Sequence, residues 1–241
     1  MSAAPIQEAR PRLVIAGATG LMGTEMLRQL AGCGAFAHTQ VLAREPIRTG
    51  LRGVDATIVP CDEPAEWPKL RADVAVVLFD PPRMYYERER ALWTPQPRQL
   101  PALARWLRES GVETLAVVLP HDQGRLPEAL KRGLASMDEQ AVAALHFERL
   151  IIVRSPRKPS APDPASLFAR VAQLMLSILR YMVPASEQPV RAAKVAQLVA
   201  FALRSAPPGI HIAAPELVWR AGQGTLAEVA GQWLAPRNTA Q

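Results

Sequence analysis

The chain has 241 residues, of which 49% are hydrophobic and 21% are charged, proportions typical of a globular domain and not of a disordered chain. This length suits one α/β domain, or one domain with a small appendage. The net charge of +6 and a pI near 9.9 are compatible with anionic partners such as nucleotides. The basic residues are scattered along the chain, which favours a solvated surface over nucleic-acid binding.

The cysteine and histidine content predicts neither a disulfide scaffold nor a metal site. Cys33 and Cys61 have no metal or redox spacing, and His38, His146 and His211 are too far apart for a ligand set. We therefore expect a reducing compartment. No apolar signal segment is visible near the start, and no stretch is long and apolar enough for a membrane span. The sequence thus predicts a cytoplasmic protein.

The first element is a strand that leads directly into a glycine turn and a helix. Residues 13–16 are an apolar run rich in β-forming residues, and Gly17-Ala18-Thr19-Gly20-Leu21-Met22-Gly23 follows at once. Apolar side chains then recur at helical spacing on one side of the next segment, at Met22, Met26, Leu27 and Leu30. Gly32 and Gly34 are expected to end this helix.

Five more apolar segments predict strands, at residues 40–43, 56–60, 73–79, 113–119 and 150–153. The continuous run at 73–79 is typical of a strand that is buried on both faces. Intervening helices are expected at residues 100–110 and 137–145.

This alternation of strands and helices predicts an α/β protein with parallel strand pairing and right-handed crossovers. We therefore expect a doubly wound parallel sheet, the Rossmann fold. Its ligand crevice should lie at the carboxyl ends of the strands, where the strand order reverses.

The character of the sequence changes after Arg154. We therefore expect a Rossmann core over residues 1–154 and a small, mostly helical C-terminal region over residues 155–241, packed on the same domain. Residues 155–164 are rich in proline and predict a loop.

Two helices are expected in the C-terminal region, at residues 167–183 and 190–204, and a short apolar stretch lies at 210–212. A narrow polar stripe on the first of these helices leaves a broad apolar surface. That surface favours burial against the sheet or another helix, with a homodimer face or a membrane surface as alternatives.

Gly17, Gly20 and Gly23 have the spacing of a dinucleotide-binding turn. Such a turn must be tight, must let the backbone approach a pyrophosphate and must let the helix pack closely on the strand. The helix N-terminus supplies free N–H groups and a partial positive charge. We therefore predict a nicotinamide cofactor here. The alternative is a Rossmann-like sheet that keeps its glycines without binding a cofactor.

Arg44 follows the second predicted strand, where the adenosine ribose is recognised. A carboxylate at this place would bind the ribose 2′-hydroxyl of NAD, whereas an arginine suits the 2′-phosphate of NADP. Leu42 and Ala43 offer no carboxylate, so we expect NADP in preference to NAD. The alternative is a surface arginine beside Glu45.

Three stretches resemble the atypical short-chain dehydrogenase/reductase family, at residues 13–23 (LVIAGATGLMG), 41–44 (VLAR) and 151–156 (IIVRSP). They are most similar to the Tat-interacting-protein oxidoreductase-like NAD(P)H-binding proteins, relatives of the nucleoside-diphosphate-sugar epimerases. The resemblance spans about residues 12–204.

The resemblance also implies a set of cofactor contacts. Arg44 would meet the 2′-phosphate, Asp62 the adenine, and Phe79 the ribose next to the nicotinamide. The pyrophosphate would be lined by residues of the glycine turn, which are Gly17, Thr19, Gly20, Leu21 and Met22, and Gly23 completes the motif.

The catalytic set of that family is missing from this sequence. Its reductases use a serine after the fifth strand and a tyrosine and a lysine four residues apart. Here the end of the fifth strand carries His121 and Asp122 instead of a serine, and no lysine stands four residues after Tyr85, Tyr86 or Tyr181.

The sequence therefore favours an NADP(H)-binding pseudoenzyme that senses redox state or regulates an unidentified protein or small-molecule partner. The alternative is an NADP-dependent oxidoreductase or epimerase-like enzyme with replaced catalytic groups, for which His121, Asp122 and Tyr85 are the candidates. The simpler interpretation of His121 and Asp122 is a solvated loop pair. A third hypothesis is a scaffold that has lost the cofactor.

Overall fold

The structure is a computed structural model that describes residues 10–47, 50, 52–83, 85–121, 138–156 and 190–235. Its central feature is one sheet with the strand order β3-β2-β1-β4-β5-β6-β7, in which every neighbouring pair is parallel. The strands are β1 (Arg12–Ala16), β2 (His38–Ala43), β3 (Val54–Ile58), β4 (Val74–Leu78), β5 (Thr114–His121), β6 (Arg149–Pro156) and β7 (Gly209–Ala213).

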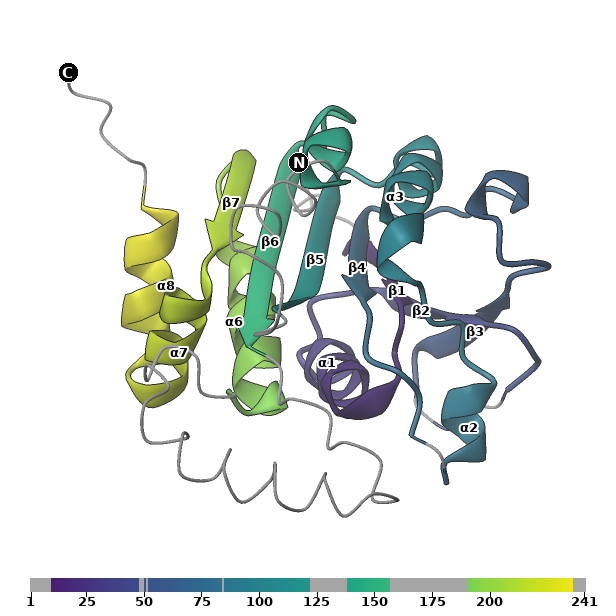
Figure 1. The fold of residues 1–241 in the computed structure, drawn as a ribbon, viewed down its shortest axis with the longest axis horizontal. Coiled ribbons are helices and arrows are strands. Elements are labelled where there is room, and N and C mark those ends of the chain that lie inside the picture. The colour runs from purple at the N-terminus through teal and green to yellow at the C-terminus, as the bar shows by residue number, and fades with distance from the viewer. Residues whose placement is uncertain are drawn as a thin grey trace, which may run out of the picture.

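The strand order reverses between β1 and β4, so the sheet is doubly wound, as the sequence predicts. Helices cover both of its faces, with α1 and α6 side by side on one face and α3 on the other (Figure 1). The named helices are α1 (Gly20–Gly32), α2 (Glu87–Arg90), α3 (Leu100–Glu109), α6 (Ala192–Ser205), α7 (Pro215–Gln223) and α8 (Leu226–Leu234), and residues 138–143 are also helical. Short 3-10 turns are η1 (Pro64–Glu66) and η2 (Pro97–Gln99).

The core is divided by the sheet into two apolar clusters. Along β1, Leu13 and Ile15 belong to the cluster under α1 and α6, whereas Val14 and Ala16 belong to the cluster under α3. This alternation follows from the two-residue period of a strand. Because both faces of β1 are buried, its carboxyl end is held in the centre of the molecule, directly before the glycine turn.

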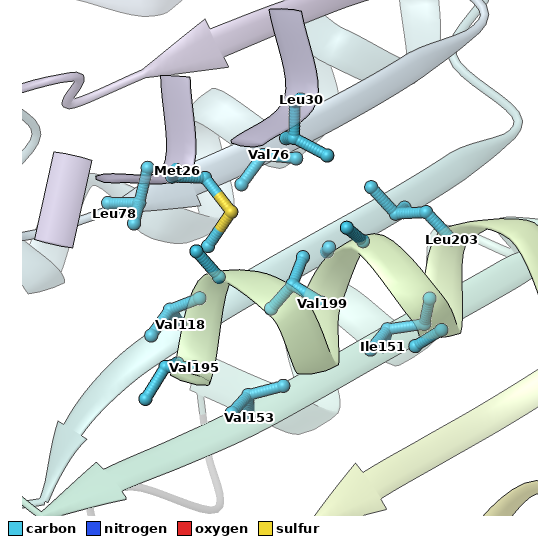
Figure 2. Packing of buried hydrophobic residues seen from close by; sticks show 14 of the residues in the cluster. Met26, Leu30, Val76, Leu78, Val118, Ile151, Val153, Val195, Val199 and Leu203 are labelled. Carbon is cyan, nitrogen blue, oxygen red and sulfur yellow. The ribbon is translucent and has the colours of Figure 1, made fainter. Parts of the chain in front are cut away.

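Two helices supply most of the apolar cover on the first face of the sheet. Figure 2 shows the side chains that they direct to the strands, which are Met26 and Leu30 from α1 and Val195, Val199 and Leu203 from α6. Each set recurs every four residues and so lies on one face of its helix. Packing between α1 and α6 anchors the helix that follows the glycine turn.

All six strands expected from the sequence are present, but β6 is longer than predicted. Ser155 and Pro156, which we expected in a loop, pair with Pro120 and His121 as the last residues of β6. The loop prediction is therefore wrong for these two residues. The physical reason is that β7 ends opposite Val153, so within the described residues β6 has only β5 as a partner here and tolerates a proline as an edge strand does.

The C-terminal region contributes a strand to the same sheet. Residues 210–212 stood out only as an apolar stretch, whereas β7 covers residues 209–213 and pairs with β6. Helix α6 agrees with the predicted helix at 190–204, and α7 and α8 were not predicted. The helix expected at 167–183 lies outside the described residues, as do residues 157–164. No helix in the described part of the chain has the length and apolar character needed to cross a lipid bilayer.

Candidate functional site

The glycine turn connects β1 to α1 at the point where the strand order reverses. Gly17 has φ +79° and Gly20 has φ +67°. Residues other than glycine adopt this backbone conformation only with strain. A Cβ on Gly17 would lie 2.1 Å from the carbonyl oxygen of Leu78, and one on Gly23 would lie 2.5 Å from the backbone of Ala18. The first and third glycines are thus required by the tight packing of the turn itself.

The second glycine is approached closely by the chain that follows β4. A Cβ on Gly20 would lie 2.8 Å from the Cβ of Asp80 and 3.0 Å from the carbonyl oxygen of Pro81. The Thr19 hydroxyl donates to the Asp80 carbonyl at 2.5 Å and lies 3.0 Å from the Thr94 hydroxyl. Residues of the protein itself therefore fill the space next to the turn.

Two carboxylates accept hydrogen bonds from backbone amides at the N-terminus of α1. The Gly20 amide donates to Glu89 Oε2 at 3.0 Å, and the Met22 amide donates to Asp80 Oδ2 at 3.3 Å. The N-terminus of a helix carries a partial positive charge and unpaired N–H groups, which attract anions. Glu89 and Asp80 therefore use the donors that the sequence assigned to a pyrophosphate.

Glu89 is held in this place by Arg83. The Arg83 amide donates to Glu89 Oε2 at 2.9 Å, and Arg83 Nε donates to Glu89 Oε1 at 2.8 Å. The guanidinium also forms an ion pair with Glu89 and lies 3.9 Å above the centre of the Tyr86 ring. The Glu89 side chain is only 8% exposed, whereas the side chain of its partner Arg83 is 33% exposed.

The pKa of Glu89 reflects two opposing effects. Burial raises the pKa, but hydrogen bonds from the Arg83 side chain, the Arg83 amide and the Gly20 amide outweigh burial and hold it below its ordinary value. The hydrogen bond to Glu89 also raises the pKa of Arg83. Glu89 is therefore a carboxylate at neutral pH, with the negative charge that a phosphate would bring to the same amides.

Residues 86–95, here called the crossing segment, run across the carboxyl ends of β1 and β2. The Gly17 amide donates to the Trp93 carbonyl at 3.2 Å, and the Trp93 amide donates to the Leu42 carbonyl at 2.9 Å. The Arg44 amide donates to the Ala91 carbonyl at 2.7 Å. These bonds tie the segment to the ends of both strands, where a Rossmann fold binds its ligand.

The Trp93 side chain is fully buried, in the apolar cluster under α3. Its Nε1 donates to Asp62 Oδ1 at 3.0 Å, and its ring meets Trp67 edge to face, with 4.7 Å between the ring centres. The same Asp62 oxygen accepts a 2.7 Å hydrogen bond from Arg44. The two residues predicted to contact adenine and 2′-phosphate thus lie together, bonded to each other and, through Asp62, to Trp93.

The other predicted site residues are more dispersed. Phe79 is buried in the cluster under α3, whereas Leu21 is 65% exposed and Tyr85 is 91% exposed. His121 is the last residue of β5, at the predicted end of that strand, and Asp122 lies outside the described residues. In the described ranges, no three His, Cys, Asp or Glu side chains are grouped as a metal site would need.

No protein-family model and no curated protein sequence matches this chain. Its structure, however, is similar to solved proteins. One is MoeE5, determined in complex with UDP-glucuronic acid and NAD, which is 13% identical, with 83% of this chain and 75% of that chain covered, and a TM-score of 0.50. Another is a nucleoside-diphosphate-sugar epimerase from Staphylococcus aureus, which is 16% identical, with 84% and 70% covered, and a TM-score of 0.51.

The chain has the Rossmann fold of these proteins. At such low identity the likeness concerns the fold, and function must be argued from the site. The main features of the site of this chain are the crossing segment and the two carboxylates at the start of α1.

Sequence reasoning missed the residues that fill the site, which are Asp80, Arg83, Glu89, Trp93 and Thr94. They form no short motif, because Glu89 lies 69 positions from its partner Gly20. One available signal was the sequence Asp80-Pro81-Pro82-Arg83 after β4, which is stiff and bulky. Bulk at that place predicts that the crevice beside the glycine turn is occupied by the chain.

A cavity of about 710 Å³ lies beside the crossing segment, on the α1 side. Its walls come from α1, from the chain after β2 and from α2, and Arg83 and Glu89 are among the lining residues. Apolar lining from Leu27 and Leu92 is combined with the arginines Arg28, Arg52 and Arg88. The buried Glu89 is thus separated from solvent by little more than its own ion pair.

Proposed function

We propose that this chain binds a nicotinamide dinucleotide, prefers NADP(H), and acts as a redox-sensing or regulatory protein and not as an oxidoreductase. The observation that carries the proposal is the glycine turn at the switch point between β1 and β4, with Gly17 and Gly20 at positive φ. The complex of the structurally similar MoeE5 with NAD agrees with a dinucleotide ligand in this fold.

The residues of the turn fit a pyrophosphate in one respect and oppose it in another. The Gly20 and Met22 amides are donors of the type that a pyrophosphate needs. Both now bond to carboxylates, from Glu89 and Asp80. A bound pyrophosphate therefore requires these two side chains to move away from the start of α1.

Arg44 supports the preference for NADP(H). Its side chain is 51% exposed and is bonded to Asp62, whose side chain is 56% exposed. An ion pair this open to solvent adds little stability, so the guanidinium can exchange it for a phosphate at low cost. No carboxylate in β2 itself is available to select the 2′-hydroxyl of NAD.

The absence of a tyrosine and lysine four residues apart supports a role other than hydride transfer. An enzymatic alternative would rest on His121, at the carboxyl end of β5. In that case His121→Ala would abolish turnover and leave dinucleotide affinity unchanged. Full turnover by that variant would eliminate the histidine role.

A scaffold that has lost the cofactor is the third candidate, and the filled crevice favours it. The crossing segment, Glu89 and Asp80 already satisfy the amides of the turn. For such a scaffold the glycines would serve only the packing of the turn, a role that Gly17 and Gly23 plainly have.

Titration of the full chain with NADPH and NADH separates a dinucleotide-binding protein from the scaffold. Quenching of tryptophan fluorescence reports binding, calorimetry confirms it, and the titration must reach millimolar ligand because an occupied site weakens apparent affinity. NADPH binding that is tighter than NADH binding supports the proposal. If neither ligand binds to this chain, to Glu89→Gln or to the double-cysteine variant, the scaffold hypothesis remains.

A further inference from the structure

We propose that the crossing segment is an internal occupant of the dinucleotide crevice, in which the Glu89 carboxylate stands in for the pyrophosphate and the Trp93 indole for the adenine. Dinucleotide and segment then compete for one site, so binding switches the segment from a docked to a displaced position. This inference rests on the proposed function, because it concerns the regulation of the same site.

The first half of the mimic is electrostatic. Glu89 places a buried negative charge against the Gly20 amide at the start of a 13-residue helix. A pyrophosphate would need the same amide and would bring the same sign of charge. The two anions cannot share this place, since like charges at contact distance repel strongly in a buried site.

The second half of the mimic is aromatic. Trp93 lies at the ends of β1 and β2 as a flat bicyclic ring, fully buried, with one N–H that donates to the Asp62 carboxylate. An adenine ring in this crevice would offer the same surface and an amino N–H to the same acceptor. The expected adenine contact, Asp62, is therefore already paired with a group of matching shape and polarity.

The segment also has features that would let it dock and release as a unit. Besides the side-chain contacts of Glu89 and Thr94 with the turn, its main chain is attached to the turn and to β2 by single hydrogen bonds, from the Gly17 amide, to the Leu42 carbonyl and from the Arg44 amide. Arg83, which lies outside the segment, donates hydrogen bonds to both carboxylate oxygens of Glu89. When the segment is docked in most molecules, only the small displaced fraction can bind the dinucleotide. The apparent affinity is then lower than the intrinsic affinity in proportion to that fraction.

The first test compares NADPH affinity of the wild type, Glu89→Gln and the control Glu87→Gln. Glu87 belongs to the same short helix, but its side chain is 91% exposed. Removing the charge of Glu89 should weaken docking and tighten NADPH binding by about tenfold or more, because lost charge-assisted bonds are worth at least that factor. Glu87→Gln should bind as the wild type does.

The second test locks the segment and does not depend on how well Glu89→Gln folds. The hydroxyls of Thr19 and Thr94 are 3.0 Å apart, so a Thr19→Cys/Thr94→Cys variant is within reach of a disulfide. The variant is made with Cys33 and Cys61 replaced by serine. The oxidised protein should bind NADPH at least about tenfold more weakly than the same protein after reduction, which serves as its own control for folding.

The outcomes distinguish the two levels of the proposal. Tighter binding by Glu89→Gln and weaker binding by the oxidised double-cysteine variant support the internal occupant. NADPH binding that is equal in the wild type, in Glu89→Gln and in both redox states overturns it and leaves the proposed function intact. No binding by any of these proteins overturns the proposed function and the inference with it.

Discussion

The amide of Gly20 donates a 3.0 Å hydrogen bond to the carboxylate of Glu89, across 69 positions of sequence. This bond joins the second glycine of the glycine turn to a buried anion that the protein itself supplies. The backbone amides at the start of α1 are therefore already bonded to anions, Glu89 and Asp80. The contribution of the residues around this place can be measured by substitution.

Substitution of the second glycine should destabilise the protein. Gly20→Ala combines a φ of +67° with a Cβ only 2.8 Å from the Asp80 Cβ, so we expect a loss of about 1–3 kcal/mol in the free energy of unfolding. Urea denaturation measures it. Gly231→Ala is the matched control, because that exposed helical glycine has nothing within 4 Å and alanine should stabilise it by up to about 1 kcal/mol. A neutral Gly20→Ala would contradict the close contact with Asp80.

The stabilising effect of Glu89 should depend on pH. Its pKa in the folded protein lies below its ordinary value of 4.5, so its contribution is present above that value and is lost as the pH falls through the folded pKa. At pH 7 we expect Glu89→Gln to lower the free energy of unfolding by about 1–3 kcal/mol. The difference between variant and wild type should shrink steadily below about pH 4.5. A difference that stays constant from pH 7 to pH 3 would rule out an ionised Glu89 as the origin.

Trp93 and Asp62 should be energetically coupled. Trp93→Phe keeps the aromatic packing but removes the N–H that bonds to Asp62, and Asp62→Ala removes the acceptor. In a double-mutant cycle on the free energy of unfolding we expect a coupling of about 0.5–1.5 kcal/mol. The pair Trp106→Phe and Asp62→Ala should give none, because the Trp106 indole donates to the Pro68 carbonyl instead.

Arg44 should determine the preference between the two dinucleotides. Arg44→Gln removes the charge that would pair with the 2′-phosphate, so NADPH affinity should fall by about tenfold or more while NADH affinity stays within about twofold. The exposed Arg105 on α3 supplies the control, and Arg105→Gln should change neither affinity. Equal losses for NADPH and NADH in Arg44→Gln would argue for a general electrostatic effect.

Much of the architecture could be derived from local patterns. The buried run of β4 and the glycine spacing after β1 predict a parallel sheet and the position of its crevice, because these patterns depend on neighbours in sequence. The same reasoning failed where the pairing of strands far apart in sequence determines where a strand ends. Pro156 continues β6 only because β7 stops opposite Val153. Strand β7 itself has only five residues, and its two isoleucines, Ile210 and Ile212, are exposed, so burial of this strand gives no strong apolar signal.

The sequence by itself determined that this chain builds a Rossmann fold with a glycine turn before a helix, because hydrophobic period and glycine spacing are local properties. Only the tertiary structure decided what meets the amides of that turn. Glu89 and Trp93 reach the ends of β1 and β2 through a path that no short motif encodes. The physical reason is that a hydrogen bond depends on positions in space, and residues far apart in sequence are placed together only when the whole sheet has formed.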